Sequence, residues 1–134
     1  MVDLKAKPFC LTDEQIKYLD SLEWSFIISG GESAVSAAIA DELKDYGTVN
    51  RIGGSDRFET SRLLAEYFSP DAESVVLVYS HNYPDGLCGG PLAIHTNAPV
   101  VLVKTDGIQE ARKLVKNLQI AKGYVIGGVK LIAD

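Results

Sequence analysis

Apolar runs of strand length alternate with amphipathic stretches along this chain, and this alternation restricts the fold more than any other feature. The runs are rich in Val, Ile, Leu and aromatic residues and occupy residues 9–11, 25–29, 48–52, 74–79, 99–103 and 123–126. Between them, apolar residues recur at helical spacing in residues 13–22, 34–46, 58–68, 91–96 and 107–118. Apolar strands separated by helices are typical of a parallel sheet that is covered on both faces. We therefore predict an α/β fold of three layers, with a mostly parallel sheet between helices.

Helix start signals agree with these boundaries. Thr12 lies three residues before Gln15, and Asp106 lies three residues before Gln109, which is the spacing of a capping side chain followed by an amide. Pro91 follows two glycines and suits the first turn of a helix. We expect helices to begin at these three places.

Composition excludes several classes of protein. The 134 residues include 13 Lys plus Arg against 18 Asp plus Glu, for a net charge of −5, and 46% are hydrophobic. This apolar fraction is too high for a disordered chain, and the acidic balance argues against a general binder of nucleic acid or anionic membranes. Any anion that the protein binds must be held by a local group of side chains. We expect one globular unit without nucleic-acid partners.

Membrane segments and metal sites are not expected either. The longest uncharged stretch, residues 86–103, is interrupted by Gly, Pro, His and Asn, so it does not read as a bilayer span. No apolar stretch typical of a secretion signal follows the first residues. Cys10 and Cys88 lack the spacing of metal ligands, and we interpret both as small buried thiols. No cofactor or metal is predicted.

An internal repeat organises the chain. Residues 8–31 resemble residues 99–128, since both contain a short apolar strand, a helix and a second strand that ends in Gly-Gly. The period is too long for common solenoids, so we interpret the unit as a small α/β module in tandem. On this reading residues 1–50 form the back half of one repeat and residues 51–134 most of the next. We expect them to make one compact α/β unit from a longer protein.

The first candidate site is the turn at Gly30-Gly31. It follows a predicted strand and opens a predicted helix, where backbone N–H groups can bind a phosphate or carboxylate. The spaced glycines of the Rossmann fingerprint and the Gly-Lys-Ser/Thr of the Walker pattern are both missing. The turn indicates either a nucleotide or small-anion site, or a tight connection that needs glycine dihedral angles.

A second glycine pair precedes another predicted helix. Ser55 or Asp56 could cap this helix, and Arg57 could pair with a nearby acid. The functional alternative is that Arg51 and Arg57 present a local cationic site to an acidic glycan.

The loop from His81 to Gly86 has the densest polar composition. It follows the strand at residues 74–79, and ligands of α/β folds commonly bind beyond the carboxyl ends of strands. His81 with Asp85 could form an acid–base pair for a hydrolase, with Ser80 as nucleophile, but no Gly-x-Ser-x-Gly elbow is present. The alternative is a loop that orders the backbone or contacts a glycan. We predict no enzymatic activity.

Several ordered motifs together resemble the type 2 cell-wall-binding repeat. The motifs are RIGGSDRFETS at residues 51–61, YPDGLCGGPLA at residues 83–93, the APVVLV run at residues 98–103, and the strands FIISGGESAVS and YVIGG. They occur in the order of the family and span most of the chain. The fold that we predict is Rossmann-like.

The resemblance implies a noncovalent anchor that attaches a surface protein, including S-layer proteins of Gram-positive bacteria, to the cell wall. Its partners would be an anionic wall polysaccharide and neighbouring repeats of the same chain, and it implies self-association at the cell surface. The residues that we assign to polymer binding combine the family's Asp-Arg and Pro-Asp elements and its apolar segment with a basic neighbour: Arg51, Asp56, Arg57, Asp85, Val100, Val101 and Leu102.

Overall fold

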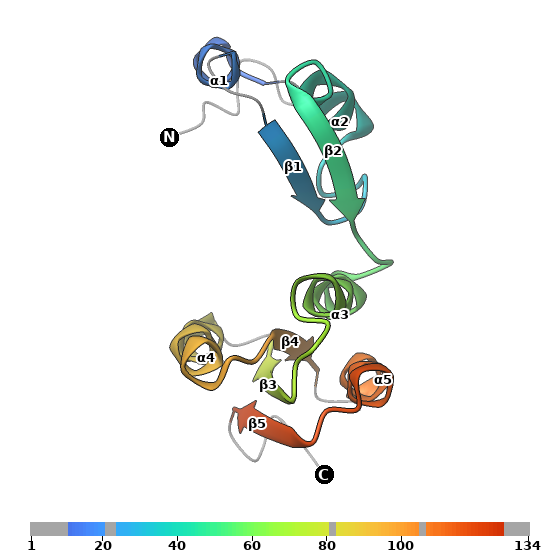
Figure 1. Ribbon diagram of the computed structural model, residues 1–134, viewed down its shortest axis with the longest axis vertical. Coiled ribbons are helices and arrows are strands. Elements are labelled where there is room, and N and C mark those ends of the chain that lie inside the picture. Colours follow the sequence, from blue (N-terminus) through green and yellow to red (C-terminus); the bar gives the residue numbers. More distant parts are fainter. Residues whose placement is uncertain (1–10, 21–23, 81–82, 105–106, 128–134) are drawn as a thin grey trace. The chain divides into compact units, whose positions relative to one another are not determined.

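The computed structural model describes residues 11–20, 24–80, 83–104 and 107–127, and the chain divides into two compact units (Figure 1). Unit 1 comprises residues 1–53 and unit 2 comprises residues 54–134. Most of the strand expected at residues 9–11 lies outside the described residues. Whether the two units correspond to two repeats stays a prediction.

Unit 1 pairs two parallel strands beside short helices. Its elements are α1 (Asp13–Leu19), β1 (Trp24–Ser29), α2 (Ala37–Leu43) and β2 (Gly47–Ile52). β1 and β2 run parallel, with Trp24 opposite Gly47 and Ser29 opposite Ile52. The predicted capping box is confirmed, because the Thr12 hydroxyl accepts the N–H of Gln15 while the Gln15 side chain accepts the N–H of Thr12.

Unit 2 contains a parallel sheet whose strand order, within the described residues, is β4-β3-β5. Its elements are α3 (Arg57–Phe68), β3 (Ser74–Tyr79), α4 (Tyr83–Thr96), β4 (Val100–Val103), α5 (Gln109–Leu118) and β5 (Lys122–Ile126). The expected strand boundaries agree with the observed ones to within one residue for β1 to β5.

Helices cover both faces of this sheet, as Figure 1 shows. On one face, Val75 packs with Val101, Val103 and residues of α3 and α5, including Leu114. On the other face, Val76, which follows Val75 in the chain, packs together with Val78 against Ala93 of α4 and its neighbours. Successive residues of a strand point to opposite faces, so each face of β3 has its own core. The α/β class is confirmed, and in this unit helices lie on both faces of the sheet, in rough agreement with the three layers that we expected.

Three expected helix starts need correction. α4 begins at Tyr83 and not at Pro91, so Pro91 lies inside the helix. Gly90 precedes it, and a glycine lacks the Cβ that would clash with the proline ring in helical conformation. α5 begins at Gln109, where Ile108 occupies the cap position without a side-chain hydrogen bond, and Asp106 lies outside the described residues. α2 is capped by Ser36 and begins later than expected.

Cysteine exposure also differs from the expectation. Cys88, which we expected to be buried, is exposed on α4, while Cys10 lies outside the described residues. Among the helices of the described residues, none is both long and apolar enough to cross a membrane.

Glycine at position 89 allows α4 to lie close against β3. A Cβ built there would stand 2.7 Å from Cγ2 of Val78, whose side chain is fully buried. A Cβ built at Gly90 would have no atom within 4 Å of it. The helix–sheet distance therefore depends on Gly89 and not on its neighbour.

We expect Gly89→Ala to lower the free energy of unfolding by about 1–3 kcal/mol, because the added methyl group overpacks a rigid part of the core. Chemical denaturation of the variant measures this, with Gly86→Ala of the same helix as the matched control, because a Cβ built there would lie 3.9 Å from Cγ1 of Val78, an ordinary contact distance. Gly89→Ala should cost less stability in a Val78→Ala background, where the added methyl group has room. Equal stabilities for the Gly89 and Gly86 variants would contradict the proposed close approach.

Candidate functional site

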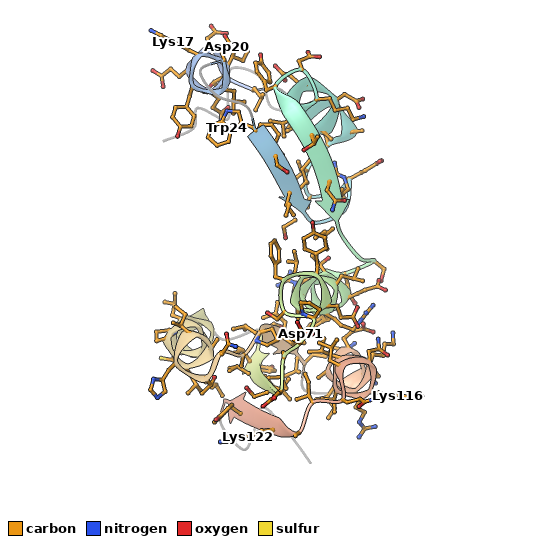
Figure 2. All side chains as sticks on the ribbon, in the orientation of Figure 1. Lys17, Asp20, Trp24, Asp71, Lys116 and Lys122 are labelled. Carbon is orange, nitrogen blue, oxygen red and sulfur yellow. The ribbon has the colours of Figure 1, made fainter. Side chains whose placement is uncertain are left out.

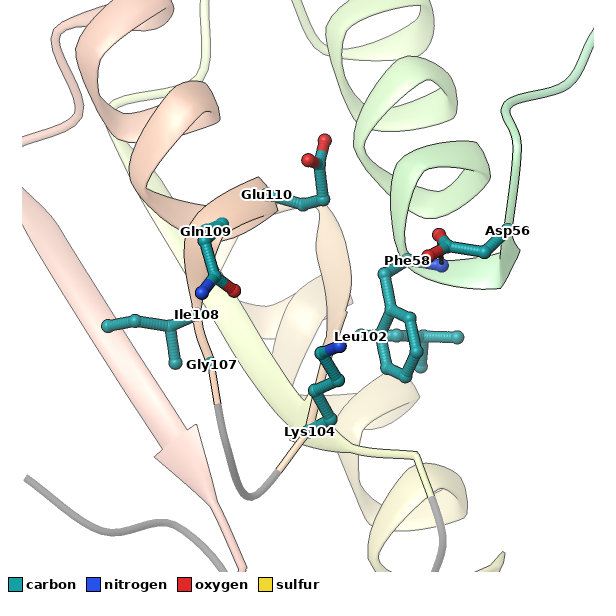
Figure 3. Close-up of a pocket in the computed structure, with 8 residues that line it drawn as sticks. All are labelled: Asp56, Phe58, Leu102, Lys104, Gly107, Ile108, Gln109 and Glu110. Carbon is teal, nitrogen blue, oxygen red and sulfur yellow. Dashed lines mark hydrogen bonds between the residues drawn. The ribbon is translucent and has the colours of Figure 1, made fainter.

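A pocket of about 130 Å³ lies in unit 2 where α3 and α5 begin and β4 ends (Figure 3). Helices in such folds run antiparallel to the strands, so their N-termini and the carboxyl ends of the strands meet at the same edge. The lining residues come from these three places: Asp56, Phe58, Leu102, Lys104, Gly107, Ile108, Gln109 and Glu110. The pocket combines an aromatic ring, a cation, a carboxamide and two carboxylates.

Lys104 supplies the positive charge of the pocket. Its Nζ lies 5.7 Å from the centroid of the Phe58 ring, which is within the range of a cation–π contact. The backbone N–H and C=O groups of Lys104 and Gly107 bond to each other at 3.5 and 3.3 Å. Figure 3 shows the side chain of Lys104 between those of Gln109 and Phe58.

Asp56 is the N-cap of α3. Its Oδ1 atom accepts the backbone N–H groups of Phe58 at 2.9 Å and Glu59 at 2.8 Å. The Thr60 hydroxyl donates to the carbonyl of Asp56 at 2.8 Å and accepts the N–H of Gly54 at 3.0 Å. Of the two cap candidates in the sequence, Asp56 is the one that caps the helix, and its charge lies at the positive end of the helix dipole.

Ser55 completes this helix start. Its backbone N–H and its hydroxyl both donate to the Glu59 carboxylate, at 2.7 and 2.9 Å. These two hydrogen bonds lower the pKa of Glu59, with the backbone N–H as the largest cause. The segment that carries the family's Asp-Arg element is thus a closed network of local hydrogen bonds.

Glu110 belongs to a charge network between α3 and α5. It accepts a hydrogen bond from Lys113 at 2.5 Å and another from the buried Arg62 at 2.6 Å, and Arg62 also bonds Glu66 at 2.6 Å. The bond from Lys113, and after it the bond from Arg62, lowers the pKa of Glu110 against the opposing effect of burial. The two cations reduce the repulsion between Glu110 and an anionic ligand only in part, because Arg62 is shared with Glu66 and Glu59.

The predicted arginines lie in different units. Arg51, in β2, donates from Nη1 to the carbonyl of Gly30 at 2.9 Å and from Nη2 to that of Ser36 at 3.4 Å. Arg57 is the first residue of α3 and is exposed, and it forms no ion pair with any residue that the structure describes. Arg51 holds backbone in unit 1, whereas Arg57 projects from the same helix start as Asp56.

The predicted apolar segment lies in β4. Val101 is fully buried in the core below α3 and α5, and the half-buried Val100 packs against the α4 side. Leu102 lines the pocket, and its N–H donates to the hydroxyl of Ser61 at 3.1 Å. Of the residues that we assigned to polymer binding, the structure brings Asp56 and Leu102 together at this pocket. The side chain of Asp85 lies outside what the structure describes.

The Gly30-Gly31 turn does not open a helix directly, which corrects our expectation. Gly30 has a φ of +109° and donates its N–H to the carbonyl of Ile52 at 2.8 Å, so it needs a glycine for its conformation. The α2 helix starts only at Ala37. The helix N-terminus that would have held a nucleotide phosphate is therefore not at the glycine pair.

The expected polar loop after β3 is shorter than its sequence indicates. Residues 83–86 form the first turn of α4, and His81 and Asn82 lie outside the described residues. The acid–base pair of His81 and Asp85 is thus not tested by the structure.

A second hollow, of about 530 Å³, lies at the amino ends of β3 and β5. Asp71 and Glu73 line it together with Lys122, whose Nζ lies 4.8 Å from the Tyr124 ring centroid. Figure 2 labels Asp71 and Lys122 in this part of unit 2. Its lining has two acids and one lysine, like the pocket at Lys104, but it includes Thr96 at the C-terminal end of α4, which is the less favourable end of a helix dipole for an anion.

Sequence reasoning missed Phe58, Lys104 and Gln109. Their positions in the chain could have indicated them, because Lys104 directly follows β4, and Phe58 and Gln109 lie at helix starts. The rule that ligands bind beyond the carboxyl ends of parallel strands was applied to β3 but not to β4.

Comparison with known proteins places the chain in a family. Residues 51–134 match the family model described as cell wall binding domain 2 (CWB2). The chain belongs to the cell wall binding domain 2 family, and the resemblance drawn from its motifs is confirmed.

Three similar proteins are consistent with this assignment. The amidase enhancer of Bacillus subtilis (strain 168) is 31% identical over 117 residues, which cover 87% of this chain and 17% of that protein. N-acetylmuramoyl-L-alanine amidase LytC of the same organism is 28% identical over 101 residues, covering 75% of this chain and 19% of that protein. The structure of Cwp6 from Clostridium difficile matches with a TM-score of 0.80 and 25% identity, over 96% of this chain and 21% of that one. The chain thus spans about a fifth of the length of each.

Removing the cap of α3 tests the structural role of Asp56. We expect Asp56→Ala to lower the free energy of unfolding by about 1 kcal/mol, because two helix N–H groups lose their acceptor, while Asp56→Ser retains most of the stability. Thermal denaturation followed by circular dichroism measures both. An alanine variant as stable as the parent would mean that the observed cap contributes nothing.

Proposed function

We propose that this chain is a noncatalytic module that anchors a surface protein to the bacterial cell wall by binding an anionic wall polysaccharide. Family membership supports binding to the cell wall. The main support for an anionic ligand is the pocket lined by α3, β4 and α5, where Lys104 lies beside the first turns of two helices. The N-terminus of α5, which no side chain caps, adds the positive end of its helix dipole to the charge of Lys104, whereas the N-terminus of α3 is already capped by Asp56.

The carboxylates of the pocket do not oppose this assignment. Asp56 is bonded to the first backbone N–H groups of α3, and Glu110 to two cations. One phosphate or carboxylate of the polymer would bind near Lys104, while the Phe58 ring and the Gln109 carboxamide provide contacts for a sugar. Arg57, exposed at the start of α3, adds a second cation beside the pocket.

A single pocket of this size gives weak binding. A polymer repeats its charged groups, so tandem modules on one chain raise the overall affinity through effective concentration. This fits a module found in relatives that are several times longer. Localisation at the cell surface follows from the same proposal. Self-association also stays a prediction, supported by Leu87 and Ile94 of α4, which are 63% and 85% exposed.

Substitution of the two cations tests the polymer site. We expect Lys104→Gln to weaken binding to purified Gram-positive cell walls about fivefold, on the order of 1 kcal/mol, because one contact to an anion is lost. Arg57→Ala should weaken binding without unfolding the protein. Sedimentation isotherms at two salt concentrations measure this, and the affinities of both variants should depend less on salt than that of the parent.

Lys122→Gln is the matched control, because Lys122 is an exposed lysine of the same unit at the amino end of β5. It should bind like the parent. Equal losses for Lys104→Gln and Lys122→Gln would show a diffuse charge effect and overturn the assignment of the pocket. Loss of folding in Arg57→Ala would show that this residue is structural.

A further inference from the structure

Two glycines identify β1 and β5 as equivalent strands of the internal repeat. Gly30 follows β1 with a φ of +109°, and Gly127 follows β5 with a φ of +150°. Among the residues that the structure describes, these two glycines have a positive φ. The sequences before them, Phe-Ile-Ile-Ser and Tyr-Val-Ile, are those that the repeat aligns, so Ile28 corresponds to Val125.

The neighbours of these equivalent strands differ. β1 pairs in parallel with β2, which follows it in the chain. β5 pairs in parallel with β3, and within the described residues no strand pairs with its other edge (Figure 1). An unpaired edge presents a row of backbone N–H and C=O groups that another strand can bind.

The handedness of crossovers places a following strand on this open edge. α5 packs on the face of Val75 and Val101 and connects β4 to β5 across β3. Val125 lies opposite Leu77, on that same face. A further right-handed crossover on this face continues in the same direction and ends beyond β5. The strand equivalent to β2 would therefore pair with the open edge.

The exposed fractions of Ile28 and Val125 also support an additional strand beside β5. Ile28 is 6% exposed in unit 1, where β2 lies beside its strand. Val125 is 58% exposed in unit 2. A large apolar side chain at a position that is buried in the equivalent strand indicates a surface that an additional element covers.

Unit 1 also shows which sequence fits such an edge. Arg51 of β2 donates to the carbonyl of Gly30, and the carbonyl of Ile52 accepts the N–H of Gly30. Gly53 passes so close that an added Cβ would stand 2.4 Å from the carbonyl carbon of Gly30. The segment Arg-Ile-Gly is thus complementary in charge and shape to a glycine of positive φ at the end of a strand.

We propose that the open edge of β5 binds the Arg-Ile-Gly-Gly strand of an adjoining repeat, whose arginine donates to the carbonyl of Gly127. The sheet of unit 2 then gains a fourth parallel strand, which is the equivalent of β2 and lies next to β5 at the end of the order β4-β3-β5. On this assignment the arginine of the motif joins consecutive repeats, and its contact is with protein backbone. The proposal does not depend on the identity of the wall polymer.

The test adds a synthetic peptide with the sequence of residues 45–54, which contains β2 and its glycines, at millimolar concentration to the isotopically labelled 134-residue chain. Hydrogen exchange of backbone amides is followed by NMR. We expect exchange at the open-edge amides of β5 to slow about tenfold, with little change in α4. A peptide with the Arg51→Gln change should protect these amides less.

Two surface variants make the test specific. Val125→Asp should weaken the protection, because its charge would lie beside the side chains of the added strand, whereas Ile94→Asp, on exposed α4, should not. The proposal is overturned if β5 exchange does not respond to the peptide, or if the Arg51→Gln peptide protects as well as the parent sequence. Protection that grows with chain concentration in the absence of peptide would also overturn it, since a second copy would then occupy the edge.

Discussion

Burial of β3 on both faces determines the architecture of unit 2. Val75, Val76 and Val78 are at most 1% exposed, and strands pair with both edges of β3. Both apolar faces must be shielded from water, so helices must lie on each side and run antiparallel to the strands. This requirement brings the N-termini of α3 and α5 to the carboxyl end of β4, and the pocket with Lys104 is a consequence of it.

The motif residues of the chain mostly shape backbone. Asp56 and Thr60 close the start of α3, and Arg51 holds the carbonyl of a glycine with positive φ. The chemistry that suits an anion comes instead from the N-terminus of α5, from Lys104, and from the hydrogen bonds that Lys113 and Arg62 donate to Glu110. This division explains how a protein of net charge −5 can present a locally favourable site for an anionic polymer.

Much of this fold could be predicted from the sequence. Strands β1 to β5 were located to within a residue, because apolar runs bounded by polar residues give a direct signal. The start of α4 was missed because Gly89, Gly90 and Pro91 have low helix propensity, whereas packing of Gly89 against Val78 favours the helix. Tertiary contact outweighed local preference there.

The candidate site was only partly predictable. Asp56 and Leu102 were found through their motifs, but Lys104 follows a strand without any motif, and its neighbours come from helix starts distant in sequence. The function of Arg51 was ambiguous for a related reason, since a guanidinium near Gly-Gly suits an anion or a backbone carbonyl equally well. Only the observed bond to Gly30 distinguishes the two within unit 1.

Co-sedimentation with Gram-positive cell walls, before and after chemical extraction of their anionic polymers, tests the central claim most directly. We expect the purified chain, at a concentration high enough for a weak single site, to sediment with untreated walls and to stay in solution with extracted ones, with the peptidoglycan content of the two samples matched. Sedimentation that is unchanged by extraction, or that is absent with untreated walls, would contradict the account.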